Sequence, residues 1–193
     1  MYMDDLSEYR YGSSARNQLF TRAVGWLDQG HRFEIMRPEE QLLDLIWQFC
    51  KVSVAQSRGL HKCEFCQRTV SPIADRNGES LILGTAEIRV FGRCGTIYAA
   101  PTLIYHYVAV HHYKPPEEFV QALREGPRPP EQVYFEKLRE LRLPWNSTSK
   151  PLDPAEAKVL AAKADGLANA KLRQRRRWLR WQRLRRFIFF LDN

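Results

Sequence analysis

The clearest pattern in the first third of the chain is a helix-type repeat of apolar residues. Pro38, Glu39 and Glu40 suit a first helical turn, because this turn leaves N–H groups unpaired and favours acidic side chains. The apolar positions behind them recur every three or four residues: Leu42, Leu45, Ile46 and Phe49. We therefore predict an amphipathic helix that runs to about Lys51.

The middle of the chain is rich in β-branched and aromatic residues. Asn77-Gly78 favours a tight hairpin turn. Three β-rich pieces follow, at 81–83, 86–91 and 97–100. We predict that these three pieces pair as a small antiparallel β-meander.

Helical patterns return after the β-rich pieces. Residues 102–112 form a predicted helix that Pro115-Pro116 must end, and further helices are predicted from 117 onward and over about 131–141. Residues 144–154 are typical of a linker, and 155–193 are Ala-rich and then Arg-rich. We predict an α+β fold: a zinc-stabilised domain over 1–143 with flanking helices, then the linker, then an appended basic amphipathic helical tail.

The net charge of +8 belongs to this tail. Nine of the 30 basic residues lie between Lys171 and Arg186 with no acid among them, and the other 21 are balanced by 21 acidic residues within 1–170. The neutral body therefore gives no electrostatic reason to bind nucleic acid. No apolar run approaches the roughly 18 residues of a transmembrane segment. The polar N-terminus is unlike a secretory signal, so we expect a cytoplasmic protein.

Two cysteines and two histidines have the spacing of a zinc site. Cys63 and Cys66 are separated by two residues, and His106 and His111 by four on a predicted helix. Structural zinc sites use such paired ligands, and the order knuckle, hairpin, helix predicts a treble-clef-like structural Zn²⁺ site. His61 and His112 are alternative ligands that the spacing leaves open. Cys50 is predicted to lie in the core and Cys94 to be a free thiol in a turn.

No catalytic motif accompanies this metal site. A catalytic zinc keeps an open position and usually needs a nearby carboxylate. Glu64 and Glu87 are near in sequence, but neither lies in a hydrolase or deaminase motif. Glu87 and Arg89 share one face of a predicted strand, which we interpret as a solvated sheet face rather than a contact surface.

The tail combines arginine with tryptophan on a predicted helix. Such a helix can dock on the body or a partner, contact nucleic-acid phosphates or lie on an anionic membrane. The candidate contact residues are Arg173, Arg175, Arg176, Arg177, Trp178, Arg180, Trp181, Arg183, Arg185 and Arg186.

A set of short motifs is specific when taken together: GWL at 25–27, GH at 30–31, GLHKCEFC at 59–66, GTAEIRVFG at 84–92, YAAP at 98–101, IYHYV at 104–108 and YKPPEEF at 113–119. Together they resemble an uncharacterised family of bacterial proteins that carry a domain of unknown function. The resemblance covers about residues 2–126 and implies one domain and a bacterial origin, but no activity. His112 departs from the small residue that the family pattern implies, which keeps the choice between His111 and His112 open.

These observations favour a non-enzymatic, zinc-stabilised binding or regulatory protein whose partner is a macromolecule, in the first place a protein. A nucleic-acid-binding protein that uses the zinc module and residues 171–193 is the first alternative. A zinc-dependent hydrolase is the second.

Overall fold

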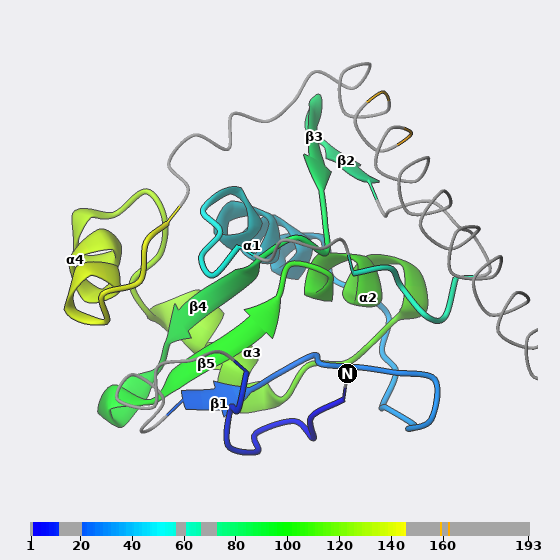
Figure 1. Ribbon diagram of the computed structural model, residues 1–193, viewed down its shortest axis with the longest axis horizontal. Helices are drawn as coiled ribbons and strands as arrows, with labels where there is room; N and C mark the ends of the chain where they lie inside the picture. Colours follow the sequence, from blue (N-terminus) through cyan, green and yellow to red (C-terminus); the bar gives the residue numbers. More distant parts are fainter. Residues whose placement is uncertain are drawn as a thin grey trace, which may run out of the picture.

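The computed structural model describes residues 2–11, 21–56, 61–66 and 73–145, together with Val159 and Ala162. The predicted α+β class is confirmed, and all four helices predicted within 1–143 are present (Figure 1). In chain order the elements are β1 Thr21–Ala23, α1 Glu40–Lys51, β2 Ile73–Arg76, β3 Glu79–Ile82, β4 Glu87–Phe91, the 3-10 turn Arg93–Gly95, β5 Ile97–Pro101, α2 Ile104–His111, α3 Glu117–Glu125 and α4 Gln132–Glu140. None of the helices among these residues has the length and apolar character needed to cross a membrane.

The strands form two sheets rather than one meander. β4 pairs antiparallel with β5, as predicted, and β1 lies parallel to β5 on its other side. β3 pairs with β2 and not with β4, so the predicted three-stranded meander was wrong in its connections. The reason is that Val54 occupies the outer edge of β4, where its N–H and carbonyl bond to Glu87 at 2.8 and 2.9 Å.

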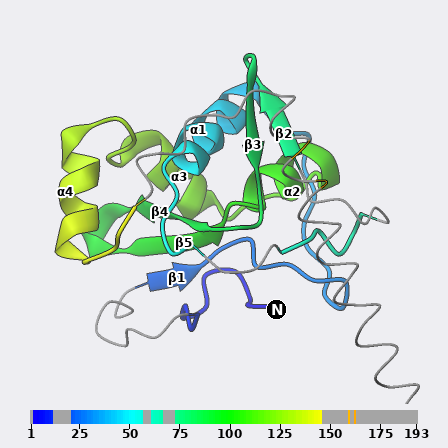
Figure 2. The same ribbon diagram turned by 45° about the horizontal axis from the view of Figure 1, so that its top comes forward.

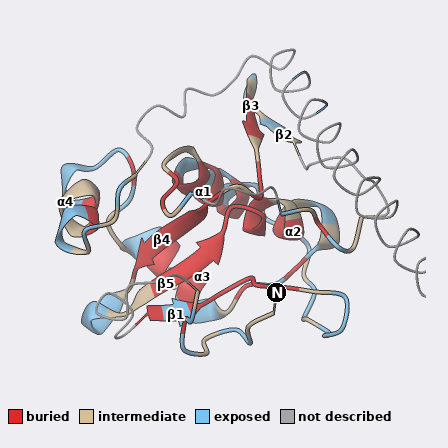
Figure 3. Cartoon of the chain, in the orientation of Figure 1, coloured by how far each residue is buried: buried red, intermediate tan, exposed pale blue. Residues whose placement is uncertain are grey.

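The three-stranded sheet is covered on both faces. α1 and α3 pack against β4 and against each other, which places them on one face. On the other face, Trp26 donates a hydrogen bond from Nε1 to the carbonyl of Ala99 at 3.0 Å and its ring packs against Tyr9. All five residues of β4 are therefore buried, as the colouring in Figure 3 shows.

The β2–β3 hairpin packs on the helices, away from this sheet (Figures 1 and 2). Its turn uses Asn77 at φ 52° and Gly78 at φ 77°, the two left-handed conformations that the predicted Asn-Gly turn requires. Arg76 ties the hairpin to α1, because its Nε lies 2.6 Å from Asp44 and its Nη2 lies 3.0 Å from Glu40. The hairpin thus leads the chain from the cysteine pair to the sheet.

Helix α2 ends in a way that orients its last histidine. His112 follows the helix in the left-handed conformation, with φ 58°, and its N–H caps the carbonyl of Tyr107. The helix is therefore finished before Pro115-Pro116, three residues earlier than proline alone would require.

Candidate metal centre

The structure brings the four predicted ligands into one cluster. Cys63 and Cys66 come from the knuckle that follows residue 61, and His106 and His111 come from the first and last turns of α2. One ligand atom from each residue lies within 4.8 Å of the other three. All four cysteines of the chain are free thiols.

The distances within the cluster suit a tetrahedral metal. The Sγ of Cys63 lies 3.2 Å from His111 Nε2, and the Sγ of Cys66 lies 3.2 and 3.3 Å from the Nε2 atoms of His106 and His111. The two Nε2 atoms are 3.2 Å apart. With Zn–S near 2.3 Å and Zn–N near 2.0–2.1 Å, neighbouring ligands of a tetrahedral zinc are about 3.3 to 3.8 Å apart. The distances of 3.2 to 3.3 Å lie at or just below the lower end of this range, so the donor set of two sulfurs and two nitrogens suits Zn²⁺ in type and is close to its spacing.

The local environment sets the protonation state of the ligands. Burial, together with the charge of His111, lowers the pKa of His106 to about 4, and burial also lowers the pKa of His111. Both imidazoles are therefore neutral near pH 7, which is the form that binds a metal. Burial raises the pKa of Cys63 to about 11, so a metal that binds this thiol displaces a proton.

Packing between aromatic rings holds the knuckle against α2. The ring of Phe65, between the two cysteines, packs edge-on against Tyr107 at 5.8 Å and tilted against His111 at 5.3 Å. It also meets Phe33 edge-on at 5.3 Å, which links the knuckle to the segment before α1. Phe65 was not among the predicted site residues, although its position as an aromatic residue inside the CxxC knuckle was a signal for it.

The other candidate ligands lie outside the cluster. His112 is exposed beyond the left-handed turn, and its carbonyl accepts from Met36 N–H at 2.8 Å. His61 is exposed, and its N–H donates to the carbonyl of Gly84 at 2.8 Å. Cys50 is buried in the core and Cys94 is an exposed free thiol, as predicted.

Glu87 and Arg89 do not form a solvated sheet face, so that interpretation was wrong. Their side chains are 4 % and 6 % exposed and form an ion pair at 2.7 Å. The hydroxyl of Tyr9 donates to the same carboxylate oxygen at 2.7 Å, and the Tyr134 hydroxyl donates to the Arg89 carbonyl at 3.1 Å. Sequence alternation placed both residues on one face, but Tyr9, which covers their side chains, comes from the distant N-terminal segment.

The carboxylate of Glu64 is turned toward a different neighbour. Its Oε2 accepts from the Gln29 N–H at 3.5 Å, and its carbonyl accepts from the Gln29 side-chain amide. The two acids considered as partners of a catalytic metal, Glu64 and Glu87, thus have interactions elsewhere.

The predicted tail falls almost entirely outside the described residues. Of the stretch 155–193, only Val159 and Ala162 are described, and both are helical and exposed. The ten arginine and tryptophan residues predicted to contact nucleic acid or membrane lie outside the described part, and the linker 144–154 is described only for its first two residues.

Comparison with known proteins yields a family and no activity. No curated protein and no solved structure matches the chain. A family model described as a domain of unknown function, DUF7919, matches residues 1–124, which include all four residues of the cluster. This match confirms the resemblance that the motifs indicated. The chain therefore belongs to the DUF7919 family of domains of unknown function.

Proposed function

We propose that this protein is a non-enzymatic, zinc-stabilised binding or regulatory protein whose partner is another protein. The observation that carries the proposal is the cluster of two thiols and two imidazoles at tetrahedral spacing. When bound, Zn²⁺ would be held by Cys63, Cys66, His106 and His111 and would fasten the knuckle to the end of α2.

The ligand count favours a structural role for the metal. Four protein ligands fill a tetrahedral site, whereas a catalytic zinc has three and keeps a place for water. The carboxylate of Glu87 is engaged by Tyr9 and Arg89, and that of Glu64 faces Gln29. These arrangements support binding over hydrolysis.

The charge distribution favours a protein partner. Residues 1–170 hold equal numbers of basic and acidic side chains, so the metal-pinned body has no excess positive charge for phosphates. None of the four cysteines forms a disulfide, which suits a reducing compartment, and we place the protein in the cytoplasm.

The first experiment is metal analysis of tag-free protein together with thermal unfolding. We expect one zinc per chain, lost in Cys63→Ser and in His106→Ala. Each variant is expected to unfold at least about 3 °C lower, the shift that a loss of about 1 kcal/mol produces in a domain of about 150 residues. Cys94→Ser and His112→Asn are matched controls and should keep both the zinc and the unfolding temperature, because neither side chain belongs to the cluster.

Two outcomes would contradict this assignment. Metal-free wild-type protein that stays folded and gains no stability from added zinc would show that the cluster is not a metal site. Loss of zinc in His112→Asn with retention in His106→Ala would show that the ligand set is different.

Nucleic acid and the membrane surface remain alternative partners through residues 171–193. Binding to DNA or RNA that weakens steeply with salt, and that is lost on deletion of 171–193, would favour the nucleic-acid alternative. Binding to anionic vesicles that needs Trp178 and Trp181 would favour a peripheral membrane contact.

A further inference from the structure

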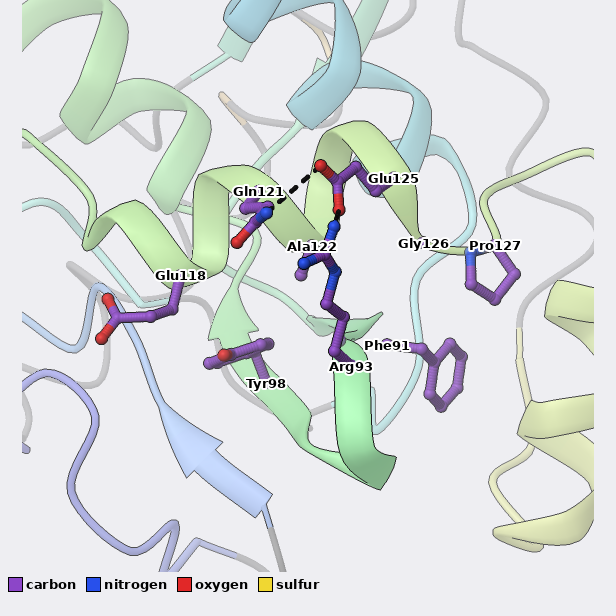
Figure 4. A pocket seen from close by; sticks show the side chains of 10 residues that line it. Phe91, Arg93, Tyr98, Glu118, Gln121, Ala122, Glu125, Gly126 and Pro127 are labelled. Carbon is purple, nitrogen blue, oxygen red and sulfur yellow. Dashed lines mark hydrogen bonds and ion pairs between the residues drawn. The ribbon is translucent and has the colours of Figure 1, made fainter.

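A hollow of about 340 Å³ lies between α3 and the turn that joins β4 to β5 (Figure 4). Glu118, Gln121 and Glu125 line it from one face of α3, and Arg93 and Tyr98 line it from the turn and β5. None of these residues belongs to the Cys/His cluster. A ligand of this hollow would therefore bind independently of the metal.

The hollow already contains one guanidinium group. Arg93 crosses in front of Ala122 and places its Nη2 2.7 Å from the carboxylate of Glu125 (Figure 4). The Arg93 and Glu125 side chains are 72 % and 46 % exposed, so water screens the pair and makes it weak. The pair shows that the carboxylates of α3 can receive an arginine side chain here.

The other half of the hollow is left with hydrogen-bond acceptors. Gln121 donates its amide N–H to Glu125 at 3.2 Å, and Figure 4 shows its carbonyl oxygen turned to the side where Tyr98 and Glu118 lie. The carboxylate of Glu118 has no hydrogen-bond or ion-pair partner within the described ranges. A carbonyl oxygen and a carboxylate are both hydrogen-bond acceptors, so a ligand that binds them must supply hydrogen-bond donors.

Tyr98 adds a buried polar group that lacks a partner. Its side chain belongs to a residue that is only 7 % exposed, and its hydroxyl makes no hydrogen bond to any residue that the structure describes. Because Tyr98 lines the hollow, its hydroxyl can be reached from there, and a ligand group that bonds to it would bind favourably. Burial and the nearby charge of Glu118 raise the pKa of Tyr98, the charge of Arg22 lowers it, and the net rise keeps the phenol neutral.

We propose that Glu118, Gln121 and Tyr98 form a binding site for a guanidinium group, that is, for an arginine side chain. Guanidinium carries five N–H donors in a plane and no acceptor, which matches a carboxylate, an amide carbonyl and a phenol oxygen. An ammonium group has three donors on a compact charge and matches the spread of acceptors less well.

This arginine can come from a partner protein or from the chain itself. Eight arginines lie between Lys171 and Arg186, and 25 residues separate this stretch from Trp145. Those 25 residues would span about 38 Å as a helix and at most about 80 Å when extended, and both lengths are comparable with the width of a domain of this size. The two sources share one chemistry and are separated by the experiment.

The test uses full-length, zinc-loaded protein with ¹³C-labelled tyrosine rings, observed by NMR. The probe is N-acetyl-arginine methylamide, and the comparators are the lysine and citrulline analogues. The Tyr98 signal is assigned with Tyr98→Phe. The affinity is measured in wild type, in Glu118→Gln and in the charge-matched control Glu140→Gln, whose carboxylate lies at the end of α4. A second full-length chain carries glutamine at the eight arginines of 171–186.

We expect the arginine probe to shift the Tyr98 signal and to bind at least about tenfold more tightly than either comparator. Glu118→Gln should weaken it about tenfold, and Glu140→Gln should leave it unchanged. If the variant with eight glutamines shows a moved Tyr98 signal before any probe is added, and then binds the probe more tightly, the arginine of the site comes from the chain's own segment. If the Tyr98 signal and the probe affinity are both unchanged in this variant, the arginine comes from a partner protein. A Tyr98 signal that ignores the arginine probe in both chains, or that responds equally to lysine, would overturn the proposal.

Discussion

The buried pair of Glu87 and Arg89 offers a strong test of how the interior is held together. Glu87→Met removes the carboxylate but keeps the volume, and it leaves the Arg89 guanidinium in a place where its side chain is 6 % exposed. The bonds left to Arg89 are 3.1 Å to the Ile88 carbonyl and 3.5 Å to the Tyr9 hydroxyl. Neither partner carries a charge.

The size of the effect follows from the positive charge of Arg89, which stays buried after its carboxylate partner is removed. Removing one partner of a buried ion pair destabilises a protein by about 3–5 kcal/mol, because the other charge stays buried. Replacing both partners with apolar residues is often close to neutral. We therefore expect Glu87→Met to lower the free energy of unfolding by about 3–5 kcal/mol, and the double variant with Arg89→Met to be at least about 2 kcal/mol more stable than this single variant.

The assay is urea unfolding followed by tryptophan fluorescence at neutral pH and a fixed zinc concentration. Wild type, both single variants and the double variant form a thermodynamic cycle. A cost below about 1 kcal/mol for each single variant is the value of an exposed pair, and would refute the buried arrangement. If the double variant loses as much free energy of unfolding as the two single variants added together, the cost does not come from an unneutralised buried charge, and the reasoning is refuted.

Three further predictions concern histidine titration, backbone strain and the hairpin. Acidifying the metal-free protein should lower its free energy of unfolding between about pH 6.5 and pH 4, because His106 has a pKa of about 4 when folded and takes up its proton at higher pH when unfolded. Urea titrations should show a smaller slope in His106→Gln, where only the lowered pKa of His111 still contributes. Gly84→Ala should lower the free energy of unfolding by at least about 2 kcal/mol, because φ is +83° and the new Cβ would lie 2.1 Å from the His61 carbonyl oxygen. Gly78→Ala has open space around its new Cβ and should cost only about 1 kcal/mol in the same urea assay. Arg76→Gln should lower the free energy of unfolding by about 1 kcal/mol or less, but it should speed amide hydrogen exchange across 73–82 more than in the core. An equal increase of exchange in both regions would contradict the role of Arg76 in holding the hairpin to α1.

Local sequence signals predicted the parts of the fold that depend on neighbouring residues. The helical repeat located α1, Asn77-Gly78 located the hairpin turn, and the paired spacing of Cys63/Cys66 and His106/His111 located the cluster. Each of these signals acts over a few residues, within one turn, knuckle or helix. These predictions were correct because the local preferences of these residues agree with the tertiary structure around them.

Contacts between distant parts of the chain could not be read in this way. Three residues, Thr21–Ala23, carry no strand pattern, yet they complete the sheet by pairing with β5. The burial of Glu87 depends on Tyr9, which is 78 positions away. The choice of His111 over His112 follows from one left-handed residue at the end of α2. None of these facts is encoded in a local period or spacing.

The cluster has a consequence for chain entropy. A metal that joins Cys63 to His111 closes a loop of 48 residues, and this loop contains the hairpin, β4, β5 and α2. By the loop-closure relation for a covalent cross-link, holding such a loop shut removes about 4 kcal/mol of unfolded-state entropy. Zinc would thus act as a reversible equivalent of a disulfide cross-link. A shortage of zinc in the cell would then lower the amount of the whole folded domain, and not only disturb the surface around the metal.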